Sequence, residues 1–197
     1  WQEDVERVAA VREAIGREAY LMVDANRAFN AAAATALGRQ IAAYDIFWFE
    51  EPVPPEDIEG YCTVRAALPM FIAGGEAEYT RYGFRRLFQA QAVDVVQPEI
   101  CATGGLSECR KIADMAHTAG VFYVPHMHGS ALALAANLQL IAAMAPVSSA
   151  FGPTPPTVEL DTMANPLREE LLVEALAPVN GRLSCWMGSS SNCHALL

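Results

Sequence analysis

The chain has 197 residues, of which 53% are hydrophobic and 18% are charged, and its formal net charge is −10. This composition is typical of a globular protein and excludes an intrinsically disordered one. The acidic excess argues against binding to nucleic acid or to an anionic membrane surface, although a bound cation could reverse the local field for an anionic substrate.

Cysteine usage and hydropathy indicate the cellular compartment in which the protein is expected. None of the five cysteines forms a CxxC pair, so the sequence predicts neither a disulfide framework nor a thiolate zinc site and favours the cytoplasm. The longest apolar stretch, 131–146, contains Asn137 and Gln139 and is too short to span a membrane. The first residues carry no signal peptide and are typical of the middle of a domain.

Short apolar runs alternate with segments of helical periodicity along most of the chain. Strands are predicted at 20–24, 46–50, 70–74, 93–97, 121–125 and near 148–151. Helices are predicted at 3–16, 31–43, from 54–57 to 68, 81–90, 106–118 and 130–144. In the third of these helices, the two prolines at 54 and 55 are expected in the first turn.

Strict alternation of strand and helix predicts an α/β fold with a parallel sheet. About six units of 22–27 residues favour a partial TIM-type (β/α) barrel over a doubly wound sheet, because a complete barrel has eight strands. We assign this domain to residues 1–184 and expect the first barrel strands to be missing. Residues 185–197 lose all periodicity and are predicted to be an irregular tail.

Three carboxylates follow the first three predicted strands at one period. Asp24, Glu50 and Glu76 are spaced 26 residues apart, each at the end of an apolar run. The carboxyl ends of parallel strands meet at one rim, and oxygen-rich clusters are what Mg²⁺ seeks. A single carboxylate at a strand end is more often a solvated loop residue or a helix cap, but three at one period predict a metal site.

The next two strand ends carry a candidate acid–base pair. Glu99 follows the fourth strand and His126 the fifth, so the two side chains are expected to be within hydrogen-bonding reach. A carboxylate bonded to one imidazole nitrogen selects the tautomer and makes the ring a stronger base. The alternative is that His126 is a packed or capping histidine. His128 is given a minor substrate contact at most.

These motifs together resemble the enolase superfamily, and within it the mandelate racemase-like and acid-sugar dehydratase branch. The matching stretches, in order, are VDAN (23–26), WFEEP (48–52), GGE (74–76), QPE with a following GG (97–99 and 104–105) and VPH (124–126). The resemblance covers about residues 1–183. It implies a barrel domain preceded by an N-terminal capping domain, which is expected to be missing here together with the lysine motif of the second barrel strand.

The resemblance also implies roles for individual residues. Asp24, Glu50 and Glu76 correspond to the Mg²⁺ ligands, and Glu51 is then a neighbour of the site. Glu99 and His126 resemble the His–carboxylate dyad, although the family more often has Asp at the first position, which leaves the dyad geometry open. Two further side chains resemble substrate contacts, Asn26 and Glu159. The second of these could equally be a solvated loop glutamate.

The activity implied is Mg²⁺-dependent removal of the proton α to a carboxylate. The leading expectation is a lyase that dehydrates a sugar acid or hydroxy acid to a 2-keto acid. The alternatives are a racemase or epimerase of a 2-hydroxy acid, or an inactive partial barrel that only binds metal. The partner is expected to be a small carboxylate substrate, with no nucleic acid or membrane partner, and the full-length protein is expected to be a homo-oligomer in the cytoplasm.

Overall fold

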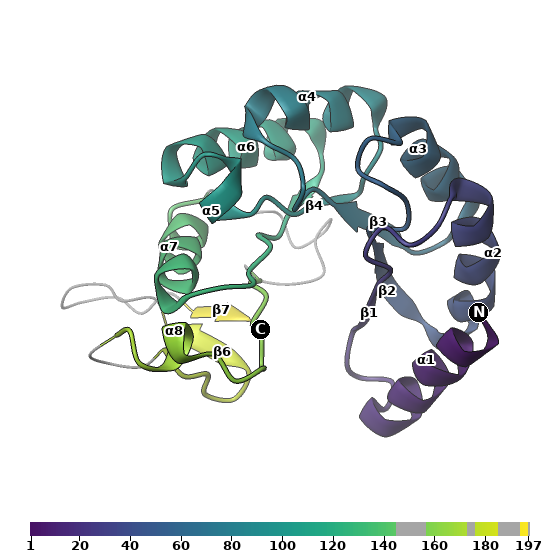
Figure 1. Cartoon of the computed structure of the whole chain (residues 1–197), viewed down its shortest axis with the longest axis horizontal. Coiled ribbons are helices and arrows are strands. Elements are labelled where there is room, and N and C mark those ends of the chain that lie inside the picture. Colours follow the sequence, from purple (N-terminus) through teal and green to yellow (C-terminus); the bar gives the residue numbers. More distant parts are fainter. Residues whose placement is uncertain (145–156, 173–175, 185–193, 197) are drawn as a thin grey trace. The chain divides into compact units, whose positions relative to one another are not determined.

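The structure, a computed structural model shown in Figure 1, describes residues 1–144, 157–172, 176–184 and 194–196. It contains two compact units: one comprises Trp1–Gly75 and Arg85–Val95, and the other comprises Glu76–Phe84 and Val96–Leu197. Among the described residues, no helix has the length and apolar character that crossing a membrane requires. The strand predicted near 148–151 lies outside the described residues.

The first unit alternates helices and parallel strands. In chain order its elements are α1 (Gln2–Ile15), β1 (Leu21–Asp24), α2 (Ala31–Ile41), a short 3₁₀ helix (Ala42–Tyr44), β2 (Ile46–Glu50), α3 (Ile58–Ala67) and β3 (Phe71–Gly74). Strand β2 is paired in parallel with β1 on one side and with β3 on the other. Because β2 has neighbours on both sides, most of its residues are buried, including Trp48 and Phe49.

The remaining elements continue this alternation as far as α7, apart from the additional short helix α5, and then depart from it. They are α4 (Thr80–Ala90), β4 (Val95–Val96), α5 (Ile100–Thr103), α6 (Leu106–Ala119), β5 (Phe122–Tyr123), α7 (Ala131–Ala142), α8 (Pro166–Glu169), β6 (Arg182–Ser184) and β7 (His194–Leu196). Strands β1 to β5 are hydrogen-bonded in chain order, and β6 pairs with β7 in antiparallel fashion. The predicted irregular tail therefore includes one short strand, β7.

Side-chain caps set several helix boundaries. The side chains of Asn30, Asp57 and Ser130 accept hydrogen bonds from the backbone amides at the starts of α2, α3 and α7. The expectation that Pro54 and Pro55 begin α3 is wrong, because Asp57 is the capping residue and the prolines form the turn before it. Gly120 ends α6 in the left-handed conformation that glycine favours.

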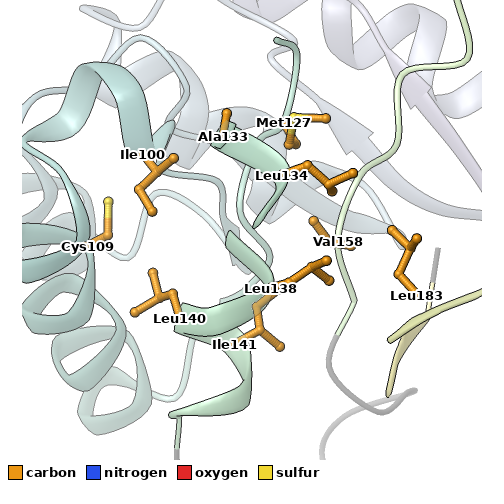
Figure 2. Close-up of a cluster of buried hydrophobic side chains, with 10 residues drawn as sticks. All are labelled: Ile100, Cys109, Met127, Ala133, Leu134, Leu138, Leu140, Ile141, Val158 and Leu183. Carbon is orange, nitrogen blue, oxygen red and sulfur yellow. The ribbon is translucent and has the colours of Figure 1, made fainter. Parts of the chain in front are cut away.

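The core of the second unit anchors the backbone next to His126 and Glu159. Ten buried side chains form one cluster, drawn in Figure 2: Ile100, Cys109, Met127, Ala133, Leu134, Leu138, Leu140, Ile141, Val158 and Leu183. Met127 and Val158 are chain neighbours of His126 and Glu159, two of the residues singled out by the sequence. Burial of an apolar side chain beside each polar one anchors the backbone on which the polar group is carried.

Candidate active site

Two of the predicted metal ligands end neighbouring strands of the first unit. Asp24 is the last residue of β1, Glu50 is the last residue of β2, and the two are direct partners in the parallel register. Glu50 is only 6% exposed, and its Oε2 accepts a hydrogen bond from the indole Nε1 of Trp48 at 3.0 Å. Residues two apart in a strand lie on the same face, so Trp48 holds the carboxylate of Glu50.

Asn26, the predicted substrate contact, lies in the exposed turn that follows β1. Its backbone φ is 43°, a left-handed conformation that asparagine adopts more readily than most residues. Its backbone N–H donates to Oδ1 of Asp24 at 2.7 Å, and its side-chain Oδ1 accepts from Nη2 of Arg27 at 3.1 Å. The turn therefore links Asn26 to a predicted metal ligand on one side and to a guanidinium on the other.

In the second unit the imidazole of His126 lies between two carboxylates. Its Nδ1 is 2.9 Å from Oε2 of Glu99, and its Nε2 is 3.0 Å from Oε2 of Glu76. The structure thus brings the predicted dyad together, and the longer glutamate side chain reaches the ring where an aspartate is more common. The contact with Glu76 was not predicted, because Glu76 was expected to face a metal ion.

These contacts control the protonation of the ring. Burial opposes the charged form of His126, but the hydrogen bonds with Glu76 and Glu99 outweigh it and raise the pKa of the imidazole to about 10. For Glu99, burial acts against ionisation, but bonds from His126 and from the amide of Cys101 prevail and lower the pKa of the carboxyl. As arranged, an imidazolium lies between two carboxylates, so the ring holds a proton that it can transfer.

Glu159 lies in the same unit, where two donors fix its carboxyl group. Its Oε1 accepts from Nε2 of Gln97 at 3.1 Å, and its Oε2 accepts from the backbone N–H of Met127 at 3.0 Å. Burial raises the pKa of Glu159, while the Met127 amide and the charge of His126 act in the opposite direction. The carboxyl group of Glu159 is therefore partly buried and held by two hydrogen bonds. Its role as a substrate contact stays a prediction.

The three predicted Mg²⁺ ligands belong to two different units, Asp24 and Glu50 to the first and Glu76 to the second. Within the described residues, no group of three or more His, Cys, Asp and Glu side chains is arranged to hold a metal ion. Asp24 and Glu50 are paired in the first unit, whereas Glu76 is turned toward His126 in the second. The donor set itself suits Mg²⁺, because all of its members are carboxylates. The assignment of these three ligands stays a prediction.

Two fully buried amides support the site without having been predicted to do so. Gln97 is part of the QPE motif and holds Glu159, and Asn137 of α7 donates from Nδ2 to the carbonyl oxygen of His126 at 3.4 Å. The signal for Gln97 was its position two residues before Glu99 at a strand end. Asn137 interrupts an apolar helix, and such a buried amide needs a hydrogen-bonding partner. His128, by contrast, is exposed and lies 3.8 Å from Asp161.

Known proteins resemble the chain over nearly its whole length. It is 46% identical to D-galactarolactone cycloisomerase from Agrobacterium fabrum, over 91% of this chain and 48% of that protein. It is 33% identical to arabinonate dehydratase from Saccharolobus solfataricus, over 92% of this chain and 46% of that protein. The chain thus spans about half the length of these curated relatives.

A solved structure gives the same result at the level of the fold. The crystal structure of the 3,6-anhydro-D-galactonate cycloisomerase from Zobellia galactanivorans has a TM-score of 0.85 and 43% identity, over 92% of this chain and 49% of that one. This likeness confirms the predicted class, a partial (β/α) barrel. The family described as enolase C-terminal domain-like matches residues 1–186. The chain therefore belongs to the enolase C-terminal domain-like family, as its strand-end motifs predicted.

Proposed function

We propose that the protein of which this chain is part removes the proton α to the carboxylate of a sugar acid and then eliminates the oxygen on the β carbon. The observation that carries this proposal is the imidazole of His126, held between the carboxylates of Glu76 and Glu99 at 3.0 and 2.9 Å. Glu99 anchors the ring through Nδ1, so Nε2, which contacts Glu76 in this structure, has the fixed direction that proton transfer to carbon requires once that contact is released. The cytoplasmic location and the homo-oligomeric state are further predictions.

Each side chain has a separate task in this proposal. Once Nε2 has lost its proton and its contact with Glu76, His126 takes the α proton at that nitrogen, and Glu99 orients the ring through Nδ1 and stabilises the charged form that results. Glu159, anchored by Gln97, contacts the substrate carboxylate, and Asn26 contacts a polar group of the substrate from the turn after β1. The enediolate that forms then expels the β oxygen, which leaves with a proton, and tautomerisation gives a 2-keto acid.

Asp24, Glu50 and Glu76 are the residues that would hold Mg²⁺. An α proton is only weakly acidic because its removal places two negative charges on one enediolate. The positive charge of the ion, when bound, stabilises that intermediate, and the pairing of a His base with Mg²⁺ is recognised chemistry of this superfamily.

The identity of the leaving oxygen separates two forms of the reaction. If the β oxygen is a hydroxyl, it departs as water and the reaction is a dehydration. If the β oxygen belongs to a ring, it stays attached elsewhere in the molecule and the reaction is an isomerisation. The two cycloisomerases are more identical to this chain, at 46% and 43%, than the arabinonate dehydratase at 33%. We therefore place cyclic sugar-acid derivatives first among candidate substrates and open-chain sugar acids second.

The reaction is tested with the full gene product, Mg²⁺ and a panel of sugar-acid lactones, anhydro sugar acids and open-chain sugar acids in deuterated water. NMR follows exchange of the α proton, and mass spectrometry follows the product. Isomerisation leaves the substrate mass unchanged, whereas dehydration removes one water. Exchange without elimination would favour the racemase alternative. Absence of α-proton exchange across the panel would contradict the proposal.

Replacement of Glu50 by Gln tests the metal site separately. The variant keeps the side-chain volume but removes a charged oxygen ligand, so its Mg²⁺ affinity by calorimetry should fall by more than the roughly 10–100-fold typical of outer-shell changes. Glu56→Gln is the matched control, because Glu56 is exposed and precedes α3. Equal Mg²⁺ affinities in the wild type and Glu50→Gln would remove Glu50 from the ligand set.

A further inference from the structure

The second glutamate of the EEP motif carries a buried carboxylate. The side chain of Glu51 is 1% exposed, and its Oε2 lies 3.1 Å from Nε of Arg27, whose side chain is 37% exposed. A buried charge is costly unless it is paired, and removal of one partner of such a pair is strongly destabilising. A buried charge at this position therefore requires a physical reason.

Arg27 joins the buried carboxylate to the turn after β1. Its backbone N–H donates to the carbonyl oxygen of Glu51 at 2.8 Å, while its Nη2 donates to Oδ1 of Asn26 at 3.1 Å. The amide of Ala25 also donates to the carbonyl oxygen of Glu50 at 3.0 Å. The ends of β1 and β2 are thus tied by two backbone bonds and one ion pair.

The backbone at this junction is unusual. Asn26, Arg27 and Glu51 have φ values of 43°, 66° and 36°, in the left-handed region that residues other than glycine seldom occupy. Such conformations persist only where the surroundings impose them, and they gather at functional sites. Here those surroundings include the contacts between Arg27 and Glu51, the bond from the amide of Asn26 to Asp24 and the bond from the amide of Glu51 to the carbonyl oxygen of Ala73.

We propose that Arg27 and Glu51 form a positioning pair, in which the buried Glu51 anchors the guanidinium and the guanidinium orients the side chain of Asn26 next to Asp24. The inference rests on the proposed function for the roles of Asn26 and Asp24. A guanidinium can only donate hydrogen bonds, so it selects Oδ1 of Asn26 and turns the Nδ2 hydrogens toward other acceptors. The pair thus gives Asn26 a fixed donor direction, suited to a hydroxyl, carboxylate or ring oxygen of a sugar acid.

The first test uses the metal-free protein and does not depend on catalysis. In the wild type, NMR relaxation of the Asn26 side-chain amide should show low mobility. Arg27→Met and Glu51→Gln should each increase the mobility of that amide. Arg39→Gln and Glu56→Gln are the charge-matched controls, because both side chains are exposed and neither residue belongs to the turn or to the EEP motif, and they should leave the amide signal unchanged.

The second test measures Mg²⁺ affinity and the KM of the full gene product. Because Asn26 contacts Asp24 through its backbone, loss of the pair should weaken Mg²⁺ binding by about 10–100-fold, the range expected for groups behind a ligand. KM should rise more than kcat falls, since Asn26 contacts substrate rather than the reacting carbon. Arg27→Lys keeps the charge but not the fork of donors, so it should restore Mg²⁺ affinity better than it restores KM.

Arg27→Met removes the ion-pair partner of a buried charge and is expected to be destabilising, so the double variant Arg27→Met/Glu51→Gln is included. It should recover thermal stability relative to Arg27→Met while the Asn26 amide stays mobile. The inference is overturned if the variants lower thermal stability yet keep the wild-type Asn26 signal, because the pair is then only structural. Failure of the wild type to bind Mg²⁺ would overturn the proposed metal site, and the Asn26 signal would still decide whether the pair positions that side chain.

Discussion

The ring of His126 makes its two closest polar contacts with residues far away in the sequence, Glu76 and Glu99. Each contact acts on a different nitrogen, so both N–H groups of the charged ring have a carboxylate acceptor and the orientation of the ring is determined. Asn137 adds a bond to the backbone of the same residue. A histidine that was merely packed in the core would not need two carboxylates, and this arrangement is why we favour a role in proton transfer.

Replacement of His126 by Asn tests that role. Removal of the ring takes away the group that accepts the α proton, so exchange of that proton into deuterated water should slow by about 10²–10⁴-fold, the usual contribution of a general base. Mg²⁺ affinity is measured in parallel, because His126 contacts Glu76. His117→Asn, at an exposed position on α6, is the control and should exchange at the wild-type rate. Unchanged exchange in His126→Asn would mean that His126 is structural.

At the scale of elements, β3 packs tightly against α3 just before the predicted ligand Glu76. A Cβ atom placed on Gly74, the last residue of β3, would lie 2.8 Å from the hydroxyl oxygen of Tyr61 and 3.1 Å from its Cε1. Tyr61 is almost fully buried on α3. The glycine in the GGE motif therefore serves a close approach between strand and helix, which is a reason for glycine other than a special turn.

Gly74→Ala should lower the free energy of unfolding by about 1–3 kcal/mol, the range for overpacked cores, as measured by urea denaturation. Tyr61→Phe removes the atom nearest to the added methyl group, so the alanine should cost less in that background. Gly129→Ala is the control, because its Cβ would meet Ala133 at an ordinary 3.9 Å. If the cost of the alanine is the same with Tyr61 and with Phe at position 61, the clash is not its cause.

At the level of the whole molecule, the chain has 23 Asp and Glu residues and a net charge of −10. Carboxylates that are paired in the folded state make its stability depend on pH in the acid range. Arg81 of α4 bonds Glu108 of α6 through its Nε at 2.7 Å and its backbone N–H at 2.8 Å. The bonds from Arg81 lower the pKa of Glu108 to about 2. The hydrogen bond from the backbone N–H of Met163, and then the bond from the side chain of Arg168, lower the pKa of Asp161.

The sign of the pH dependence follows from these lowered values. A carboxyl group whose pKa is lower in the folded state contributes stability above its unfolded pKa and loses it as the pH falls through the folded pKa. Stability should therefore decrease between about pH 5 and pH 2. Urea denaturation of Glu108→Gln should show a shallower decrease over that range than the wild type. Glu13→Gln, at an exposed position on α1, should follow the wild-type curve, and equal slopes in Glu108→Gln would contradict the assignment.

The amino-acid pattern was enough to predict the alternation of strands and helices, and to predict that Asp24, Glu50, Glu76, Glu99 and His126 lie at or within three residues after strand ends. Both depend on the local period of apolar residues, which can be counted along the chain. It placed β2 at its observed bounds, Ile46–Glu50. It missed α5 and made β4 and β5 too long, because elements of two to four residues leave too short a pattern to detect.

Apart from the Glu99–His126 pair, the partners of the polar groups became visible only in the folded chain. The bond from His126 to Glu76, the anchoring of Glu159 by Gln97 and the burial of Glu51 against Arg27 all join residues distant in sequence. No local period encodes such pairs, because a carboxylate at a strand end has the same sequence signature whether it faces a metal ion, an imidazole or a guanidinium. The partner is determined by burial, because a charged or amide group that is removed from water must be paired with a group on the chain segment that packs beside it.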